Sequence, residues 1–94
     1  MASVTVIYAG IWHLWLSPGI SSLAADDLEE AMAIINMESG PILKRKLRIM
    51  HSDSKGKIES YSHVLINDIV PSEGLKTKLE DGDTIKLVPI IVGG

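Results

Sequence analysis

Beta-branched and aromatic residues dominate the start of the chain and predict two strands. Residues 4–9 (VTVIYA) have the composition of a strand, and Gly10 is suited to a turn. Residues 11–16 (IWHLWL) are predicted to form a second strand, which ends at residues 17–19 (SPG). The sequence therefore predicts that a hairpin opens the protein.

A helical period follows the predicted hairpin. Asp26 or Asp27 is placed to cap the helix, and Glu29 or Glu30, three residues later, completes a capping box. The acidic side chains stand in the first turn, where the helix dipole favours negative charge. Apolar residues at i, i+3, i+4 and i+7 predict one buried face, made of Leu28, Ala31, Met32 and Ile35.

The period changes from helix to strand near residue 40. Gly40 is predicted to end the helix, and Pro41 to prevent it from resuming. Apolar and basic residues then alternate from Ile42 onward, which predicts a strand. In this strand Leu43, Arg45, Leu47 and Ile49 alternate with Lys44, Lys46, Arg48 and Met50.

Short elements fill the rest of the chain, and together they predict an α+β domain with one main helix packed on a mixed β-sheet. Ninety-four residues are enough for one domain with a modest core. We expect a turn at 52–57 and then a strand at 58–66, with Ser60, Ser62 and Val64 on one side. A turn at 67–68, a loop at 71–74 and a short helical turn within 75–79 are expected to follow. A turn at 81–83 then leads into a last strand at 84–91, with Ile85, Leu87 and Pro89 on one face.

The composition excludes several classes of function but does not identify one. The chain has no cysteine, which excludes disulfides, thiolate catalysis and zinc–thiolate sites. Its net charge of −3 gives no reason to expect nucleic acid as a partner. The first charged residue is Asp26 and the first lysine is Lys44, so the basic region of a signal peptide is missing. The early apolar run is broken too soon for a membrane helix, and we expect a cytoplasmic protein.

No catalytic or metal-binding constellation is present in the sequence. His13, His51 and His63 stand at no metal-like spacing, and we interpret them as structural or surface residues. Serine residues lack a nucleophile-elbow or lysine motif around them, and there is no phosphate-binding glycine loop. We therefore expect neither a bound cofactor nor a metal, and a protein that is not itself an enzyme.

Two surface features have a structural and a functional interpretation. The basic run at residues 44–48 (KRKLR) is by default the solvated face of a strand, and alternatively a dock for an acidic partner surface. Trp12 and Trp15 would point to opposite faces of an alternating strand. One would fill the core and the other would be a contact hot spot, unless a loop partly covers it.

The chain ends in two glycines, and this ending suggests chemistry. A terminal pair arises by chance about one time in 200, and here it directly follows a strand rich in valine and isoleucine. A carboxylate on Gly94 is a poor electrophile until ATP-dependent adenylation attaches a leaving group. Residues without Cβ also allow the chain to enter a narrow partner site. We expect a β-sheet domain over residues 1–91 and a flexible tail at 92–94.

The motifs "VLIND" and "GLKTKLEDGDTIKLVPIIVGG" resemble the MoaD/ThiS-type sulfur carriers, in their longer MoaD-like form. The match is specific from Val64 to Gly94 and includes the pattern G-L-x-T-x-L-x-D-G-D followed by P-x-x-x-G-G. The segment around residues 52–57 also resembles the longer members. Two features depart from the family: Val92 precedes the glycines, and the predicted first hairpin is uncharged.

The resemblance implies a ubiquitin-like β-grasp fold and a carrier function. It implies that a MoeB/ThiF-like enzyme uses ATP to adenylate Gly94, which then carries the thiocarboxylate, while Gly93 threads the partner's channel. A synthase large subunit, as in molybdopterin synthase, or another acceptor would receive the sulfur. Asp81, Gly82 and Asp83 match the motif and are interpreted as turn structure. Two alternatives remain: a protein modifier joined to target lysines through Gly94, and a β-grasp binding module without terminal chemistry.

Overall fold

Four strands and two α-helices make up the described part of the chain. The computed structural model describes residues 1–49 and 57–90. Its elements are, in order, β1 (Ala2–Tyr8), α1 (Ile11–Leu16), β2 (Ser22–Ala25), α2 (Leu28–Ile49), the 3₁₀ helix η1 (Ile58–Tyr61), β3 (Ser62–Ile66), the 3₁₀ helix η2 (Gly74–Lys76) and β4 (Thr84–Pro89).

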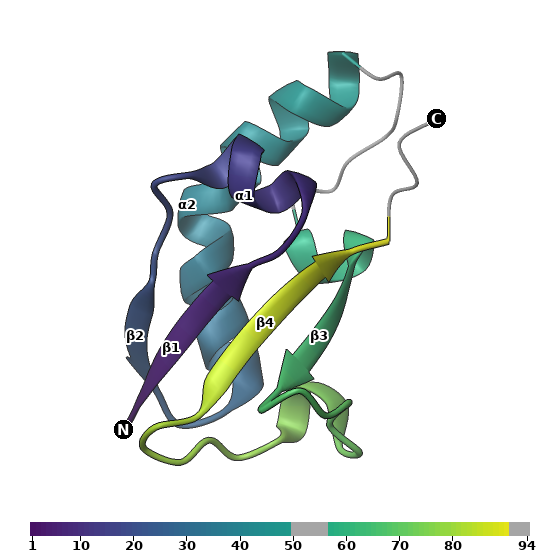
Figure 1. Ribbon diagram of the computed structural model, residues 1–94. Coiled ribbons are helices and arrows are strands. Elements are labelled where there is room, and N and C mark those ends of the chain that lie inside the picture. Colours follow the sequence, from purple (N-terminus) through teal and green to yellow (C-terminus); the bar gives the residue numbers. More distant parts are fainter. Residues whose placement is uncertain (50–56, 91–94) are drawn as a thin grey trace.

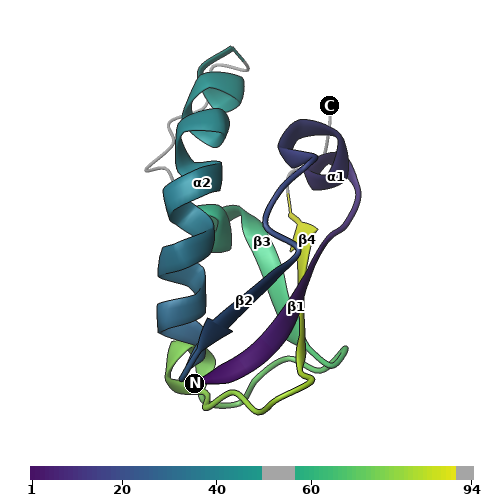
Figure 2. The same ribbon diagram turned by 90° about the vertical axis from the view of Figure 1, so that its left-hand side faces the viewer.

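The strands form one mixed sheet in the order β2-β1-β4-β3. The two central strands, β1 and β4, are parallel, and both outer pairs are antiparallel. The long helix α2 runs along one face of this sheet (Figures 1 and 2). The predicted α+β architecture, with one main helix on a mixed sheet, is confirmed.

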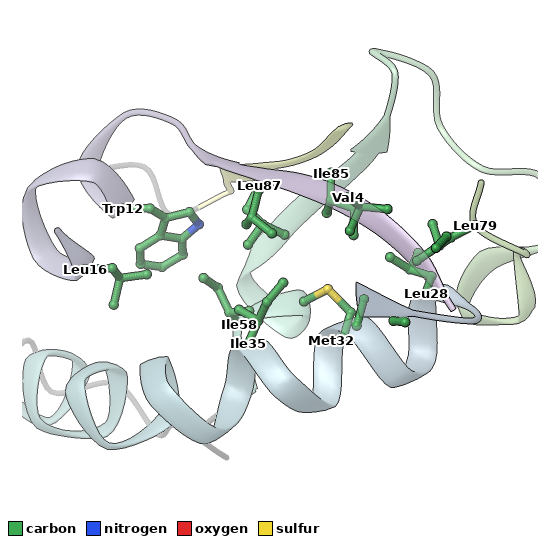
Figure 3. Packing of buried hydrophobic residues seen from close by; sticks show 14 of the residues in the cluster. Val4, Trp12, Leu16, Leu28, Met32, Ile35, Ile58, Leu79, Ile85 and Leu87 are labelled. Atoms are coloured by element: carbon green, nitrogen blue, oxygen red, sulfur yellow. The ribbon is translucent and has the colours of Figure 1, made fainter. Parts of the chain in front are cut away.

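The core lies between α2 and the inner face of the sheet (Figure 3). Alternate residues of β1 point inward, and on β4 both Ile85 and Leu87 are fully buried. The predicted apolar face of α2 is confirmed, since each of its four residues is at most 1% exposed. Burying each large side chain contributes about 1.5–3 kcal/mol. The buried members of this core are Ala2, Val4, Val6, Trp12, Leu16, Ala25, Leu28, Ala31, Met32, Ile35, Leu43, Ile58, Leu79, Ile85 and Leu87.

The N-terminus of α2 follows the sequence prediction, and Asp27 is the capping residue. Its Oδ1 accepts a hydrogen bond from the backbone N–H of Glu30 at 2.8 Å, which satisfies one of the free donors of the first turn. Asp26 instead lies beside the N-terminal amine, with its Oδ1 3.5 Å from the nitrogen of Met1.

The predicted end of this helix is wrong. Helix α2 continues through Gly40 and Pro41 to Ile49, so the strand predicted from residue 42 is helical as well. A proline inside a helix removes one backbone hydrogen bond. Burial of Leu43, which has no exposed surface, offsets this cost, since α2 packs against α1 in this region. The tertiary contact therefore overrides the local stop signal.

The second strand of the predicted hairpin is also wrong, because residues 11–16 form the helix α1. Trp12 and Leu16, four residues apart, lie on its buried side. Trp12 and Trp15 are therefore not on opposite faces. Their ring centroids are 5.6 Å apart with the rings tilted by 59°, and Trp15 is partly buried against the core. The antiparallel partner of β1 is β2, which lies after α1.

The later elements match the predictions in part. The strand expected from Ile58 begins at Ser62, because Ile58–Tyr61 is a 3₁₀ helix. The predicted turn at Asn67 and Asp68 is confirmed, and both residues have positive φ, at 52° and 66°. The short helical turn is η2, slightly earlier than expected, and β4 begins at residue 84 as predicted. Residues 50–56 and 91–94 lie outside the described residues, and with them most of the turn predicted at 52–57.

Among the described residues, every helix is too short or too polar to cross a membrane.

Candidate functional site: where the chain leaves the sheet

The parallel pairing of β1 and β4 brings the ends of both strands to the same edge of the sheet (Figure 1). The ladder continues one step beyond β1, because the N–H of Ala9 donates to the carbonyl of Leu87 at 3.0 Å. The chain then turns away from the sheet at Gly10 and enters α1. The start of α1 is therefore fixed beside the last residues of β4.

Gly10 contacts the last residue of β4. It has φ 55° and ψ −134°, a conformation that residues with a side chain rarely adopt. A Cβ built on Gly10 would lie 3.2 Å from Cγ of Pro89 and 3.6 Å from its Cδ. The absence of a side chain thus lets the proline ring lie directly against the backbone of the turn.

On its other side, the end of β4 is held by the segment before β3. Ser62 pairs with Pro89 in the antiparallel register, and the N–H of Ile90 donates to the carbonyl of Tyr61 at 2.8 Å. Ile90 is the last described residue, and its side chain is 48% exposed. The chain therefore leaves the sheet between Gly10 and Tyr61, and this pair defines the exit of β4.

A buried hydrogen-bond chain fixes the elements on both sides of the exit. Nε1–H of Trp12, on α1, donates to Oγ of Ser62 at 2.8 Å. The Ser62 hydroxyl in turn donates to the carbonyl of Ile58, in η1, at 2.7 Å. Trp12 lies two residues after Gly10, and Ser62 directly follows Tyr61. These two hydrogen bonds therefore hold the Gly10 side and the Tyr61 side of the exit at a fixed separation.

The sheet face opposite α2 leads up to the exit and carries both apolar and polar side chains. The strand register places Ile7 of β1 and Leu65 of β3 beside Lys86, and His63 beside Val88. Ile7 is 42% exposed. Lys86 lies 3.5 Å from Asp68, a solvated pair that contributes little to stability. No described element covers this face (Figure 2), which makes it available for contact with a partner.

The residues of the D-G-D motif lie at the opposite end of β4 and form a turn, as predicted. Oδ1 of Asp81 accepts from the N–H of Ser3, and Gly82 has φ +90°. Asp83 accepts from the N–H of Glu80 at 2.8 Å and from the side chain of Asn67 at 2.9 Å. These side chains organise the approach to β4.

Some of the remaining candidate residues lie outside the described residues, and the others lie exposed on the surface. Gly93 and Gly94, the predicted site residues, lie outside the described residues, as do Val92 and His51. His13 and His63 are exposed, and no three acidic or histidine side chains converge on a metal position within residues 1–49 and 57–90.

The basic run belongs to the second half of α2 instead of a strand. Lys44 and Arg45 are exposed there, and Lys46 is partly buried. Positive charge near the C-terminus of a helix interacts favourably with its dipole.

Sequence reasoning missed the part that Gly10, Pro89 and Ser62 play in the exit. The glycine after a predicted strand and the proline near the end of another were visible, but neither shows which distant residue it meets. The Trp12–Ser62 bond joins positions 50 residues apart.

Comparison with known proteins identifies two kinds of relative. The chain is 35% identical over 49 residues to the sulfur carrier protein CysO of Mycobacterium tuberculosis and of Mycobacterium bovis. That match covers 50% of this chain, and the chain spans about half (53%) of the length of these relatives. No protein-family model matches.

A solved structure matches over nearly the whole chain. It is the complex of subunits 1 and 2 of molybdopterin-converting factor from Helicobacter pylori, with a TM-score of 0.63 and 27% identity. The match covers 98% of this chain and 99% of the matched chain. The predicted ubiquitin-like β-grasp fold is thereby confirmed.

Proposed function

We propose, for a chain whose resemblance to the MoaD/ThiS-type sulfur carriers is confirmed by both comparisons, that this protein carries sulfur on its C-terminal glycine. The observation that carries the proposal is the whole-chain match to a molybdopterin-converting factor complex in a chain that ends in Gly93-Gly94. The half-length match to mycobacterial sulfur carriers supports the same function. Catalysis is supplied by partner enzymes.

The proposed chemistry takes place on the main-chain carboxylate of Gly94. The carboxylate attacks the α-phosphorus of ATP in the active site of a MoeB/ThiF-like enzyme, which gives an acyl-adenylate and releases pyrophosphate. A hydrosulfide equivalent then attacks the carbonyl carbon, AMP leaves, and a thiocarboxylate remains. Adenylation is needed because it converts a poor electrophile into one with a good leaving group. Gly93 lets the terminus pass through a narrow channel.

The geometry of the described residues suits this role. The end of β4 is held on both sides, by Gly10 and Tyr61, so the terminal residues begin from a fixed point. The sheet face opposite α2, which carries Ile7 and Val88, leads to that point. We propose that this face meets the adenylating enzyme and then a synthase large subunit. The relative from Helicobacter pylori supports the second partner, since it is a complex of two subunits.

Intact mass measurement tests the proposal. The protein is incubated with ATP, a MoeB/ThiF-like enzyme and a sulfur donor, and we expect the mass gain of one oxygen-to-sulfur exchange. A variant that lacks Gly94 is the matched control and should show no gain. Absence of both adenylate and mass change would refute the terminal chemistry and leave a binding module.

A second experiment separates a carrier from a protein modifier. A modifier would form an amide between Gly94 and a lysine of a target protein. High-mass adducts in cells that disappear when Gly94 is deleted would support conjugation. We also propose a cytoplasmic location, because the proposed chemistry uses ATP and a reduced sulfur donor.

A further inference from the structure

Gly10 lies directly beside the residue at which the chain leaves the sheet. We propose that Gly10 is a positioning residue, whose missing side chain seats Pro89 and so sets the direction in which β4 ends at Ile90. Its φ of +55° and the 3.2 Å distance from a built Cβ to Cγ of Pro89 both exclude a relaxed side chain. The inference rests on the proposed function, because direction matters only if the terminal glycine must reach a partner's active site.

The position of Pro89 in a central strand follows from the turn at Gly10. The carbonyl of Leu87 accepts a hydrogen bond from Ala9, so residue 87 points its backbone groups toward β1. Residue 89 faces the same way, since strand neighbours alternate. The next acceptor of this parallel ladder is the carbonyl of Ala9, which already accepts from the N–H of Trp12 at 3.2 Å, so a residue without an N–H fits at position 89. The proline ring packs against Gly10 instead.

The contact between Gly10 and Pro89 bears on Ile90, because the other side of the exit is also held in place. The N–H of Ile90 donates to the carbonyl of Tyr61 at 2.8 Å, on the β3 side. Ser62, next to Tyr61, is held by the buried bond from Trp12. A Cβ on Gly10 would lie 3.2 Å from Cγ of Pro89, so the ring would have to shift by a few tenths of an ångström. Because Pro89 directly precedes Ile90, we expect this shift to weaken the Ile90–Tyr61 hydrogen bond.

The seat of Pro89 fixes the point from which the terminal residues start, because Ile90, the next residue, makes the last described hydrogen bond of the chain, to Tyr61. Misplacement of a reacting group by about 1 Å can lower a rate by about 100-fold. Seating of Pro89 therefore bears on the rate of adenylation more than on binding of the carrier.

The test compares two glycine-to-alanine variants with similar φ. Gly10→Ala adds a Cβ against Pro89, whereas Gly74→Ala, at φ +57°, adds one with no heavy atom within 4 Å. The second variant thus carries strain from a positive φ without the contact. The double variant Gly10→Ala/Pro89→Ala removes the ring that the new Cβ would meet. Pro89→Ala alone removes the ring from the wild-type seat, and it tests the contact if Gly10→Ala does not fold.

The first measurement is amide hydrogen exchange of Ile90 in the free protein. We expect its protection to fall about tenfold in Gly10→Ala and in Pro89→Ala, corresponding to about 1.4 kcal/mol of local opening free energy. Gly74→Ala should leave it unchanged. Equal exchange of Ile90 in wild type, Gly10→Ala and Pro89→Ala would overturn the proposal.

The second measurement is adenylation by the activating enzyme, followed as ATP-dependent pyrophosphate release. We expect kcat to fall about tenfold in Gly10→Ala with KM nearly unchanged, because the docking face is intact. The double variant should lose no more than Pro89→Ala alone, because the ring that the new Cβ would meet is absent from both. Equal losses in Gly10→Ala and Gly74→Ala would show a general effect of strain and overturn the proposal. If wild type is not adenylated at all, the proposed function fails, whereas the exchange of Ile90 still decides whether Gly10 seats Pro89.

Discussion

The indole Nε1–H of Trp12 donates a hydrogen bond of 2.8 Å to the hydroxyl of Ser62, and both residues are buried. This contact joins α1 to the start of β3, at the residue that pairs with Pro89 in the sheet register (Figure 3 shows Trp12 above Leu16). A buried indole N–H without an acceptor is costly. The bond therefore couples the stability of the fold to the geometry of the exit.

Ser62→Ala should destabilise the protein, because it removes the acceptor of Trp12 and the donor to Ile58. We expect the free energy of unfolding to fall by about 1–3 kcal/mol, measured by denaturant titration. Ser60→Ala is the matched control, since Ser60 is exposed, and its effect should stay within about 0.5 kcal/mol. Similar losses in both variants would contradict the importance of the buried bond.

Leu43→Ala tests whether the helix continues past Pro41. Leu43 has no exposed surface, and its truncation should cost about 2–5 kcal/mol in free energy of unfolding. Lys44→Ala, at the next position, should have almost no effect, because Lys44 is exposed. Denaturant unfolding followed by circular dichroism gives both values. A helix that ended at Gly40 would leave residue 43 outside the core, and the two variants would then behave alike.

Local patterns predicted the elements whose contacts lie within one turn. Asp27 caps the backbone three residues later, so the start of α2 was visible in the sequence. A six-residue apolar run such as residues 11–16 fits a strand or a helix equally well, and only its packing decides. Pro41 indicated a helix end, yet the burial of Leu43 in the core prevails. Neither outcome could be derived from neighbouring residues.

The candidate site likewise contains residues that the sequence predicted and residues that only the fold brings together. The sequence alone nominated Gly93 and Gly94, because terminal glycines and their motif are local features. The exit depends instead on the pairing of β1 with β4, which brings Gly10 to Pro89 across 79 positions in the sequence. Turn residues such as Asp83 were recognised, since their hydrogen bonds are partly local.

Ionisation of Tyr8 should make the protein less stable in alkaline solution. Burial raises the pKa of Tyr8 above its ordinary value of 10.0, and the nearby carboxylate of Glu38 raises it further. Because the pKa is higher in the folded state, its stabilising contribution is complete below about pH 10. That contribution is lost as the pH rises through the folded pKa. Unfolding free energies measured above pH 10 should therefore fall less steeply in Tyr8→Phe than in wild type.

Glu38→Gln is the control for the origin of this shift. Removal of the negative charge should lower the pKa of Tyr8, seen as tyrosinate absorbance that appears at lower pH, while the contribution of burial remains. If Tyr8 titrated below its ordinary pKa in the folded protein, neither burial nor Glu38 could be the dominant influence.

The two halves of the C-terminal motif should separate stability from chemistry. Asp83→Ala removes the acceptor for the Glu80 N–H and for the Asn67 side chain, and should cost about 1–2 kcal/mol in free energy of unfolding. Its terminus is intact, so the folded variant should still be adenylated. Deletion of Gly93 and Gly94 should change the free energy of unfolding by less than about 0.5 kcal/mol, since terminal glycines contribute no side chains, yet abolish adenylation.

Denaturant titration and intact mass, applied to the same two variants, check this separation. Asp83→Ala should lose stability and keep the mass gain of the thiocarboxylate, and the deletion should do the reverse. Because Asp83 and the exit lie at opposite ends of β4, a defect in one should not pass to the other. Loss of adenylation in a fully folded Asp83→Ala protein would place this turn in the partner interface and contradict its purely structural role.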